Sequence, residues 1–412
     1  MPFSLLPQHK PGFSTEHVDT VLLAVVVVLV SLGLVMVSSA SIDYSALKLG
    51  DPFYFAKRHF IYICMGFTAL LLVAMMPVAF WQRHATLLLF IGVVILALVL
   101  VPGIGRKVNG SQRWVSLGGF TLQVSEFAKI FTVIFMCDFL VRRADEIRTS
   151  LAGFLKPLMI LALIAFMLLL EPDFGATVVI GLACMGVIFM SDAPLVRFVL
   201  LTLLVGVLAS LVAVLEPYRM KRLTTFVNPW ADDVKFDSGY QLTQSLIAFG
   251  RGEWSGVGLG NSVQKLFYLP EAHTDFVFSI WAEETGLIGT FIVILLFVVL
   301  VMRALIIAKN AMNIRHYFSA YLAIGLALLI AGQAFINIGV TSGLLPTKGL
   351  TLPFISYGGS SLLACCIIVG LLLRIGYETS SSEDFAKYQQ NNGVATKNRK
   401  KTLVKGSGHE KH

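Results

Sequence analysis

Charged side chains are scarce in this chain. Asp, Glu, Lys and Arg together make up 14% of its 412 residues, while hydrophobic residues make up 56%. Soluble domains usually carry about a quarter charged residues. The composition therefore excludes a string of ordinary soluble domains, which this length would otherwise allow. It favours a single bundle of membrane helices.

Cysteine is also rare, and every cysteine lies inside an apolar run. The five are Cys64, Cys137, Cys184, Cys365 and Cys366. None has metal-ligand spacing with a histidine, and no disulfide framework is visible. We interpret them as small residues that face lipid or the protein core.

Motifs of soluble enzymes are missing as well. The sequence has no Walker motif, no zinc motif and no Ser-His-Asp order. The glycine-rich stretch 256–260 lacks the strand–helix context of a nucleotide-binding turn. We therefore expect no organic cofactor. The net charge of +8 is typical of cytoplasmic loops near anionic lipid, so we expect no nucleic-acid partner.

Long apolar runs are what the sequence has in abundance. A spanning helix needs about 20 mostly apolar residues, and about ten runs meet this requirement. They lie near residues 20–40, 57–77, 84–101, 124–141, 155–171, 174–191, 195–215, 275–302, 316–342 and 354–376. The first run is too long for a cleavable signal. The sequence predicts an all-α polytopic membrane protein with a large outside loop, 216–274, between the seventh and eighth helices.

Basic residues in the short loops predict that both termini are cytoplasmic. Residues 1–18 form a short N-terminal tail, 19–377 the membrane domain, and 378–412 a polar tail for which we expect disorder. Several cations fall on the outer side instead, in the loops near residues 106–113, 219–265 and 348. Two interpretations stay open: long loops escape the charge rule, or these cations meet an anionic substrate such as a lipid pyrophosphate.

The most informative segment is Lys265–Phe276, which leads from the large loop into a predicted helix. Pro270 ends any preceding helix, and Thr274 is a candidate N-cap that would place Asp275 in the first helical turn. A helix N-terminus favours an ionised carboxylate. Asp275 is therefore either a general base at the membrane surface or only a capping residue. His273 and Glu271 are candidate substrate-binding neighbours, although no metal ligands can be identified around the histidine.

Further along the same run lie Ser279 and Glu283, spaced so that they share one helical face with Asp275. A carboxylate in the bilayer costs about 2.5–3.5 kcal/mol on insertion scales. We interpret Glu283 as a structural polar contact inside the bundle, or as a residue lining a cavity behind the base.

A second segment combines Arg113, next to an interfacial tryptophan, with Glu126 and Lys129 near the outer end of the next helix. Asn109-Gly110 is a turn signal, and Ser125 is a candidate cap of that helix. Glu126 and Lys129 are i, i+3 neighbours. They form either a self-satisfied ion pair, or a cation presented to phosphate beside a carboxylate that orients it.

A third segment, Thr347–Ser361, interrupts an apolar region with glycines and a proline. Non-helical backbone at membrane depth is tolerated where it is buried in protein or lines a cavity. Lys348 is the only cation there, and Ser356 is a candidate substrate contact. The sequence Glu171–Gly175 is most simply a tight turn, and its two acidic residues form a second candidate carboxylate pair.

These segments together resemble the SEDS family (shape, elongation, division and sporulation proteins), over residues 20–377. The motifs YLPEAHTDF, NGSQRW and LPFISYGGSS occur in the family's order. The stretch GNSVQKLFYLPEAHTDF and the lysine in LLPTKGLTLPFISYGGSS are more similar to the division-type than to the elongation-type members. The resemblance implies a ten-helix fold with cytoplasmic termini and glycosyl transfer on lipid II. It also implies that Asp275 matches the family's essential aspartate.

On this resemblance we expect an inverting glycosyl transfer that polymerises lipid II into β-1,4-linked strands for septal wall synthesis. Asp275 would be the general base, with Arg113, Lys129 and Lys348 stabilising charge on the pyrophosphate. A divalent cation, Mg²⁺ or Mn²⁺, can share that work, but its ligands cannot be identified. Two alternatives are a lipid II flippase and a scaffold without chemistry.

The partners also follow from the resemblance alone. They are a single-span class B penicillin-binding protein, which is the transpeptidase of the division machinery, and a small regulatory membrane complex. The expected location is the bacterial inner membrane at the division septum.

Overall fold

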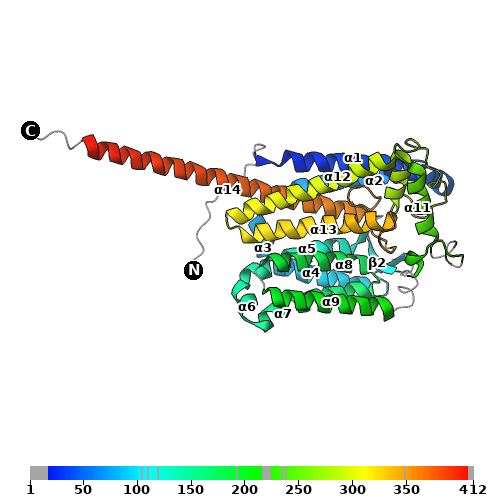
Figure 1. Cartoon of the computed structure of the whole chain (residues 1–412), viewed down its shortest axis with the longest axis horizontal. Coiled ribbons are helices and arrows are strands. Elements are labelled where there is room, and N and C mark those ends of the chain that lie inside the picture. Colours follow the sequence, from blue (N-terminus) through cyan, green and yellow to red (C-terminus); the bar gives the residue numbers. More distant parts are fainter. Residues whose placement is uncertain are drawn as a thin grey trace, which may run out of the picture.

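The chain forms a bundle of long, roughly parallel helices in the computed structural model (Figure 1). The structure describes residues 17–406, apart from 104, 109–110, 118–119, 192–193, 216–223, 233, 235, 237–238 and 348. The helices are α1 Thr20–Leu49, α2 Tyr54–Met75, α3 Val78–Arg83, α4 Ala85–Leu100, α5 Val124–Arg142, α6 Ala144–Thr149, α7 Leu151–Leu170, α8 Phe174–Met190, α9 Leu195–Leu215, α11 Tyr240–Gly252, α12 Val277–Asn313, α13 Tyr317–Thr341 and α14 Gly359–Gly406.

Each predicted apolar run coincides with one of these helices. Within the described residues, six helices are long and apolar enough to cross a membrane, and 85–100, 174–190 and 195–204 are shorter apolar helices. Large side chains remain exposed along them: Leu72 is 60% exposed, Met159 70% and Phe291 65%. Such surface is stable only against lipid. The chain is thus a multi-pass membrane protein, while the count of ten crossings stays a prediction.

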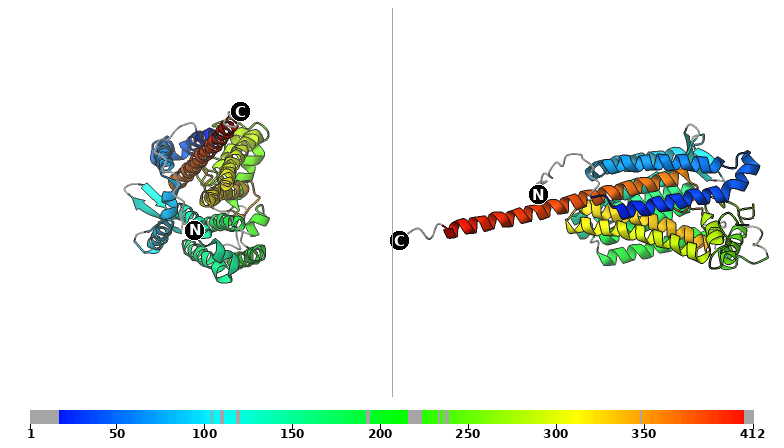
Figure 2. Two further views of the ribbon diagram at one scale, coloured as in Figure 1. Left: turned by 90° about the vertical axis from the view of Figure 1, so that its left-hand side faces the viewer. Right: turned by 90° about the horizontal axis from the view of Figure 1, so that it is seen from above.

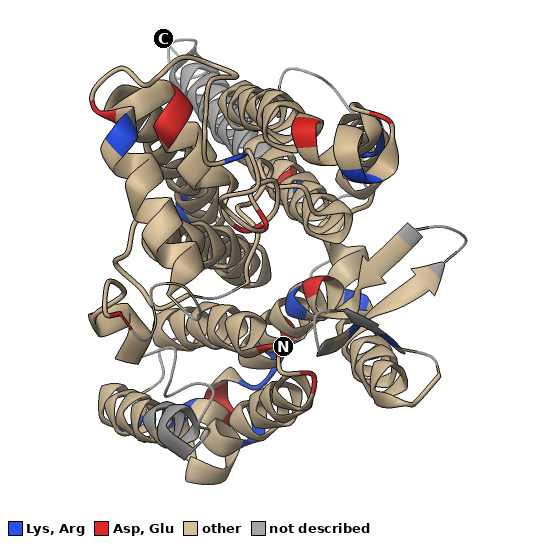
Figure 3. Cartoon of the chain, turned by 90° about the vertical axis from the view of Figure 1, so that its right-hand side faces the viewer, with Lys and Arg blue, Asp and Glu red and all other residues tan. Residues whose placement is uncertain are grey.

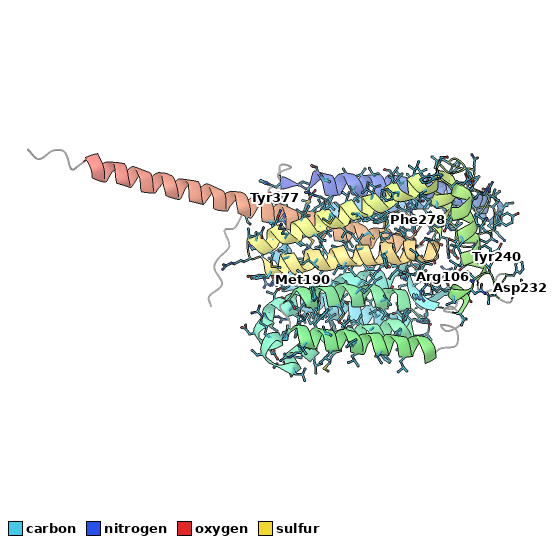
Figure 4. All side chains as sticks on the ribbon, viewed as in Figure 1. Arg106, Met190, Asp232, Tyr240, Phe278 and Tyr377 are labelled. Carbon is cyan, nitrogen blue, oxygen red and sulfur yellow. The ribbon has the colours of Figure 1, made fainter. Side chains whose placement is uncertain are left out.

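The two ends of the bundle differ. At one end, here called the hairpin end, lie the strand β2 and the crosswise helix α11 (Figures 1 and 2). At the other, here called the tail end, α14 projects far beyond the bundle. Arg106 and Tyr240 mark the hairpin end in Figure 4, and Met190 and Tyr377 mark the tail end. Helix α1 begins at the tail end, so the chain enters and leaves the bundle on the same side.

The C-terminal segment differs from the predicted disorder, because α14 continues as helix to Gly406. The sequence contains no proline after Pro353 that would end it. Extending an existing helix also needs no new nucleation. Both conditions let a polar segment continue a spanning helix.

A small antiparallel sheet at the hairpin end was missed by the all-α prediction. Its strands are β1 Gly105–Val108, β2 Ser111–Leu117 and β3 Phe120–Gln123, in the order β1-β2-β3. Trp114 pairs with Arg106 on one side and with Gln123 on the other. The predicted turn at Asn109-Gly110 lies outside the described residues.

The segment between α13 and α14 is non-helical and buried, as predicted for backbone at membrane depth. Phe354 is 1% exposed and Ile355 3%. A Cβ on Gly33, in the middle of α1, would lie 2.4 Å from the Phe354 carbonyl oxygen. Only glycine allows the backbones to approach this closely. The segment therefore re-enters the bundle, where protein rather than lipid surrounds it.

The cysteines behave as predicted. All five are free thiols; Cys64 is exposed and the other four are buried. Cys366 lies where α14 packs on α2, opposite Gly66, whose added Cβ would meet its sulfur at 2.8 Å. Small residues at such a contact allow membrane helices to pack closely.

Candidate active site

Asp275 lies at the hairpin end, two residues before α12 begins. The prediction that Thr274 caps this helix is wrong: the N-cap is Phe276, without a side-chain capping bond. The Thr274 hydroxyl donates instead to the Glu271 carboxylate at 2.6 Å. The Thr274 and Phe276 amides both donate to the Glu271 carbonyl, so a tight turn occupies the residues expected to start the helix. The helix dipole consequently acts on Asp275 less directly than predicted.

Helix α13 holds the backbone at Asp275. The Asn337 side-chain amide donates to the Asp275 carbonyl oxygen at 2.8 Å and to the Leu350 carbonyl oxygen at 2.5 Å. The Asp275 carboxylate borders the same segment, because a Cβ built on Gly349 would lie 3.0 Å from its Oδ2. Asn337 thus ties together the two stretches of chain that flank the carboxylate.

One turn earlier in α13, Gln333 extends this network. Its amide nitrogen donates to the Thr351 carbonyl oxygen at 3.1 Å and to the Ser361 hydroxyl at 3.1 Å. Its amide oxygen accepts from the Lys129 ammonium at 2.7 Å. Sequence reasoning missed both Gln333 and Asn337. The available signal was two amides four residues apart, hence on one face, in an otherwise apolar run.

Lys129 and Glu126 form the predicted ion pair. Their side chains lie 2.9 Å apart on α5, and the two residues are 3% and 4% exposed. A small cavity, lined also by Gln333, Cys365 and apolar side chains of α13 and α14, adjoins them. Removing either partner would leave an uncompensated buried charge, which is strongly unfavourable. That Lys129 also meets a phosphate stays a prediction.

Arg113 reaches from β2 to the turn between α7 and α8. Its guanidinium donates to the Glu171 carbonyl oxygen at 3.0 Å and to that of Pro172, and lies 3.8 Å from the Asp173 carboxylate. Asp173 in turn caps α8 and accepts from the Ser125 hydroxyl at 2.9 Å. Ser125 lies inside α5, so its predicted capping role is wrong. Arg113 therefore links the sheet to this turn.

Glu171 is the unusual member of that turn. It is 0% exposed, and neither of its carboxylate oxygens has a hydrogen-bond partner among the described residues. Burial raises the pKa of Glu171 to about 8; the nearby Asp173 adds to the rise, and Arg113 opposes it. The predicted carboxylate pair thus exists, and the raised pKa favours the neutral form of Glu171 beside the cap of α8.

We expect Arg113→Lys to lower the melting temperature of the detergent-solubilised chain, followed by intrinsic fluorescence. Lysine keeps the charge but lacks the planar fork that reaches two carbonyls at once. The loss of one charged hydrogen bond corresponds to about 1.5–3 kcal/mol. Arg106→Lys, at an exposed position on the neighbouring strand, is the matched control and should melt like the parent. Equal melting of both variants would show that Arg113 does not hold the turn.

The remaining predicted site residues are placed as follows. The His273 ring packs on Phe55, with ring centroids 4.5 Å apart; burial lowers its pKa, and Glu271 partly offsets this. The Ser356 hydroxyl oxygen accepts from the Leu352 amide at 2.8 Å and serves the local turn. Lys348 lies outside the described residues. Substrate contact by these residues stays a prediction.

The described part of the chain contains no group of three or more His, Cys, Asp or Glu residues that could bind a metal ion. Figure 3, which looks onto the hairpin end, shows acidic and basic positions spread over several elements there. The described residues thus offer no site built by protein ligands alone. We therefore derive no step through a metal.

Comparison with known proteins places this fold among cell-wall enzymes. The profile of a family described as "Cell cycle protein", which comprises FtsW, RodA and SpoVE, matches residues 19–381. The chain is 53% identical over 369 residues to the "Probable peptidoglycan glycosyltransferase FtsW" of Hahella chejuensis, covering 90% of this chain and 92% of that protein. It is 52% identical over 353 residues to the protein of that name from Coxiella burnetii, covering 86% and 94%.

Two solved structures have the same fold. One comes from a study of the "structural coordination of polymerization and crosslinking by a peptidoglycan synthase complex"; its TM-score is 0.71 at 29% identity, covering 88% of this chain and 98% of that one. The other is the rod shape determining protein RodA of Thermus thermophilus, with a TM-score of 0.65 at 25% identity, covering 87% and 96%.

Proposed function

The chain belongs to the FtsW, RodA and SpoVE family of cell cycle proteins, and on this basis we propose that it is a peptidoglycan glycosyltransferase that polymerises lipid II for septal wall synthesis. The observation that carries the proposal is the identity of about half the residues to relatives named for this activity, over nearly the whole length of both chains. The network around Asp275 supports it, because it fixes the backbone of this carboxylate residue at one end of the bundle.

The proposed reaction needs one base. The Asp275 carboxylate takes the proton from the 4-hydroxyl of the acceptor sugar, and that oxygen attacks the anomeric carbon of the donor. The bond from this carbon to the lipid pyrophosphate breaks on the opposite face, so an α-linkage becomes a β-1,4-linkage. Pyrophosphate is a good leaving group and needs no dedicated acid. A positioned base contributes about 10²–10⁴-fold in rate.

Cations would stabilise the leaving pyrophosphate. Lys129 is the candidate with the best-defined position, because Glu126 and Gln333 fix its ammonium before substrate arrives. Such preorganisation makes electrostatic stabilisation effective. Arg113 and Lys348 are the other candidates on our proposal. Mg²⁺ at phosphate sites often uses one or two carboxylates and takes other ligands from the substrate, and a divalent cation would be bound here in that way.

The family membership leads to a proposal on location and partners. We place the chain in the bacterial inner membrane at the septum, with both termini cytoplasmic and the hairpin end outside. A class B penicillin-binding protein with its regulatory membrane complex would be the partner. The similarity to a chain of a peptidoglycan synthase complex supports this assignment.

A polymerisation assay tests the proposal. The full chain, purified with its transpeptidase partner, is given labelled lipid II, and the products are separated by length. We expect long glycan strands that a muramidase digests. If no strands form while a control polymerase works in the same mixture, the polymerase assignment is wrong. A lipid II flippase would then be the better hypothesis, and transfer of labelled lipid II across a vesicle bilayer would test it.

A further inference from the structure

Helix α12 is interrupted inside the apolar run that the sequence presents as continuous. Gly286 has φ 68° and ψ −162°, far from helical values. Beyond it, the amides of Leu287 and Ile288 do not bond to the preceding turn of α12. They donate instead to the carbonyl oxygens of Glu253 and Trp254, at 2.9 and 3.2 Å. A stretch of the preceding loop thus replaces the normal acceptors of this helix.

The matching carbonyl groups are satisfied by the same stretch. In a continuous helix, the carbonyls of Glu283 and Glu284 would accept from the residues four positions later. Here they accept from the amides of Val257 and Gly258, both at 3.0 Å. Two helical hydrogen bonds are therefore replaced by four bonds to residues 253–258. This arrangement satisfies these two amides and two carbonyls of α12 at the break, as a membrane environment demands.

The Glu283 side chain binds residues 262–264, which follow this stretch in the chain. Its carboxylate is 0% exposed and accepts from the amides of Val263 and Gln264, at 3.1 and 3.3 Å. It also accepts from the Ser262 hydroxyl and from the Arg251 guanidinium. A carboxylate with this many donors is fixed in place. Glu283 thus makes structural polar contacts, the first of its two predicted roles, and its partners lie in residues 262–264 and, through Arg251, at the end of α11.

The Glu284 side chain fastens the loop at a second place. Its Oε1 accepts from the Lys265 ammonium at 3.2 Å and from the Ser39 hydroxyl of α1 at 2.8 Å. Lys265 also donates to the Gly260 carbonyl oxygen at 2.7 Å. The Lys265 and Glu284 side chains are 6% and 0% exposed. Lys265 is therefore the buried partner of Glu284, and not a surface cation awaiting an anionic substrate.

These contacts close residues 257–276 into a loop, here called the Asp275 loop. Its first residues, 257 and 258, are bonded to the break in α12. Its last residue, Phe276, is the N-cap of α12, and Asp275 is the residue before it. Two of its non-glycine residues, Phe267 and Glu271, have φ of 67° and 57°, which costs of order 1–3 kcal/mol each. Such a backbone keeps its shape only when its surroundings hold it.

We propose that Glu283 and Glu284 are positioning residues that fix Asp275 by anchoring the Asp275 loop to the break in α12. Neither carboxylate contacts substrate on this assignment; each acts through the loop. The proposal rests on the function proposed above, and it explains why two expensive buried carboxylates lie side by side in the helix that follows the base.

The test is Glu284→Gln in the full chain bound to its transpeptidase partner. We expect kcat for strand formation to fall at least tenfold with KM unchanged, since misplacing a catalytic group by about 1 Å can cost about 100-fold. Hydrogen exchange at the amides of residues 259–276 should become faster. Arg303→Gln is the matched control, because it breaks the pair that Arg303 of α12 makes with Asp19 at the start of α1. It should change neither quantity.

A second variant guards against simple misfolding. Glu284→Gln leaves Lys265 buried without its partner, which can destabilise the chain by itself. Lys265→Met combined with Glu284→Gln removes both charges, so the chain should fold while the loop stays loose and kcat stays low. Parental kcat in this folded double variant would overturn the proposal, as would unchanged exchange in Glu284→Gln. Faster exchange confined to the loop supports the anchoring even if the parent makes no strands, in which case only the assigned reaction fails.

Discussion

Asp275→Asn is expected to abolish strand formation, with a rate at least about 100-fold below that of the parent chain. Asparagine has almost the same shape, so the bond from Asn337 to the backbone carbonyl of residue 275 should persist. What the variant loses is the ability to take a proton from the acceptor hydroxyl. Initial rates on labelled lipid II, measured at equal amounts of folded complex, would show the difference.

The matched control for this experiment is Asp51→Asn. Asp51 lies at the hairpin end, in the connection between α1 and α2, where it pairs with the exposed Lys57. A surface pair of this kind contributes little, so the rate should not change. Equal rates for Asp275→Asn and the parent would remove Asp275 from the mechanism. Glu171, the buried acid next to Asp173, would then be the first carboxylate to examine.

Local patterns in the sequence predicted the helices, because length and apolar composition alone decide whether a segment can cross a bilayer. They also predicted the Glu126–Lys129 pair, since i, i+3 spacing fixes that neighbourhood. The start of α12 could not be predicted in the same way. The turn before it depends on Glu271 in a left-handed conformation, which a sequence does not display for a glutamate.

Contacts between distant segments were the part that sequence reasoning could not reach. Asn337 and Gln333 matter because residues 350–351 and 275 fold against α13, and no spacing rule connects these positions. The sheet is a different case. Asn-Gly between two short strands is a known hairpin signal, but those strands were too short to stand out beside the long apolar runs.

The break in α12 shows how an apolar run can hide a functional feature. A single glycine inside a predicted helix is ordinarily tolerated at a cost of about 1 kcal/mol, so Gly286 does not by itself predict a break. The determining residues lie some 30 positions earlier, in the range 252–258, and they also include glycines. Only the fold shows that these glycines and Gly286 belong to one contact.

Gly256→Ala is expected to disrupt this contact and to destabilise the chain by about 2–4 kcal/mol, with near-complete loss of strand formation. A Cβ at this position would lie 2.2 Å from the Glu284 carbonyl oxygen and 2.5 Å from the Thr285 amide nitrogen, and Gly256 has φ 79°. Both the clash and the left-handed backbone oppose any side chain. Since the clashing atoms are backbone, no side-chain rotation can relieve them.

Gly250→Ala is the control, because it makes the same substitution six residues earlier. Gly250 lies within α11, and nothing lies within 4 Å of the added Cβ, so alanine should be neutral or slightly stabilising there. Melting temperature and hydrogen exchange of residues 257–276 would be compared for both variants. Parental exchange in Gly256→Ala would mean that the loop does not depend on the break. If anchoring is the common cause, adding Glu284→Gln to Gly256→Ala should speed the exchange of residues 257–276 little further, because residues that act as one unit are not additive.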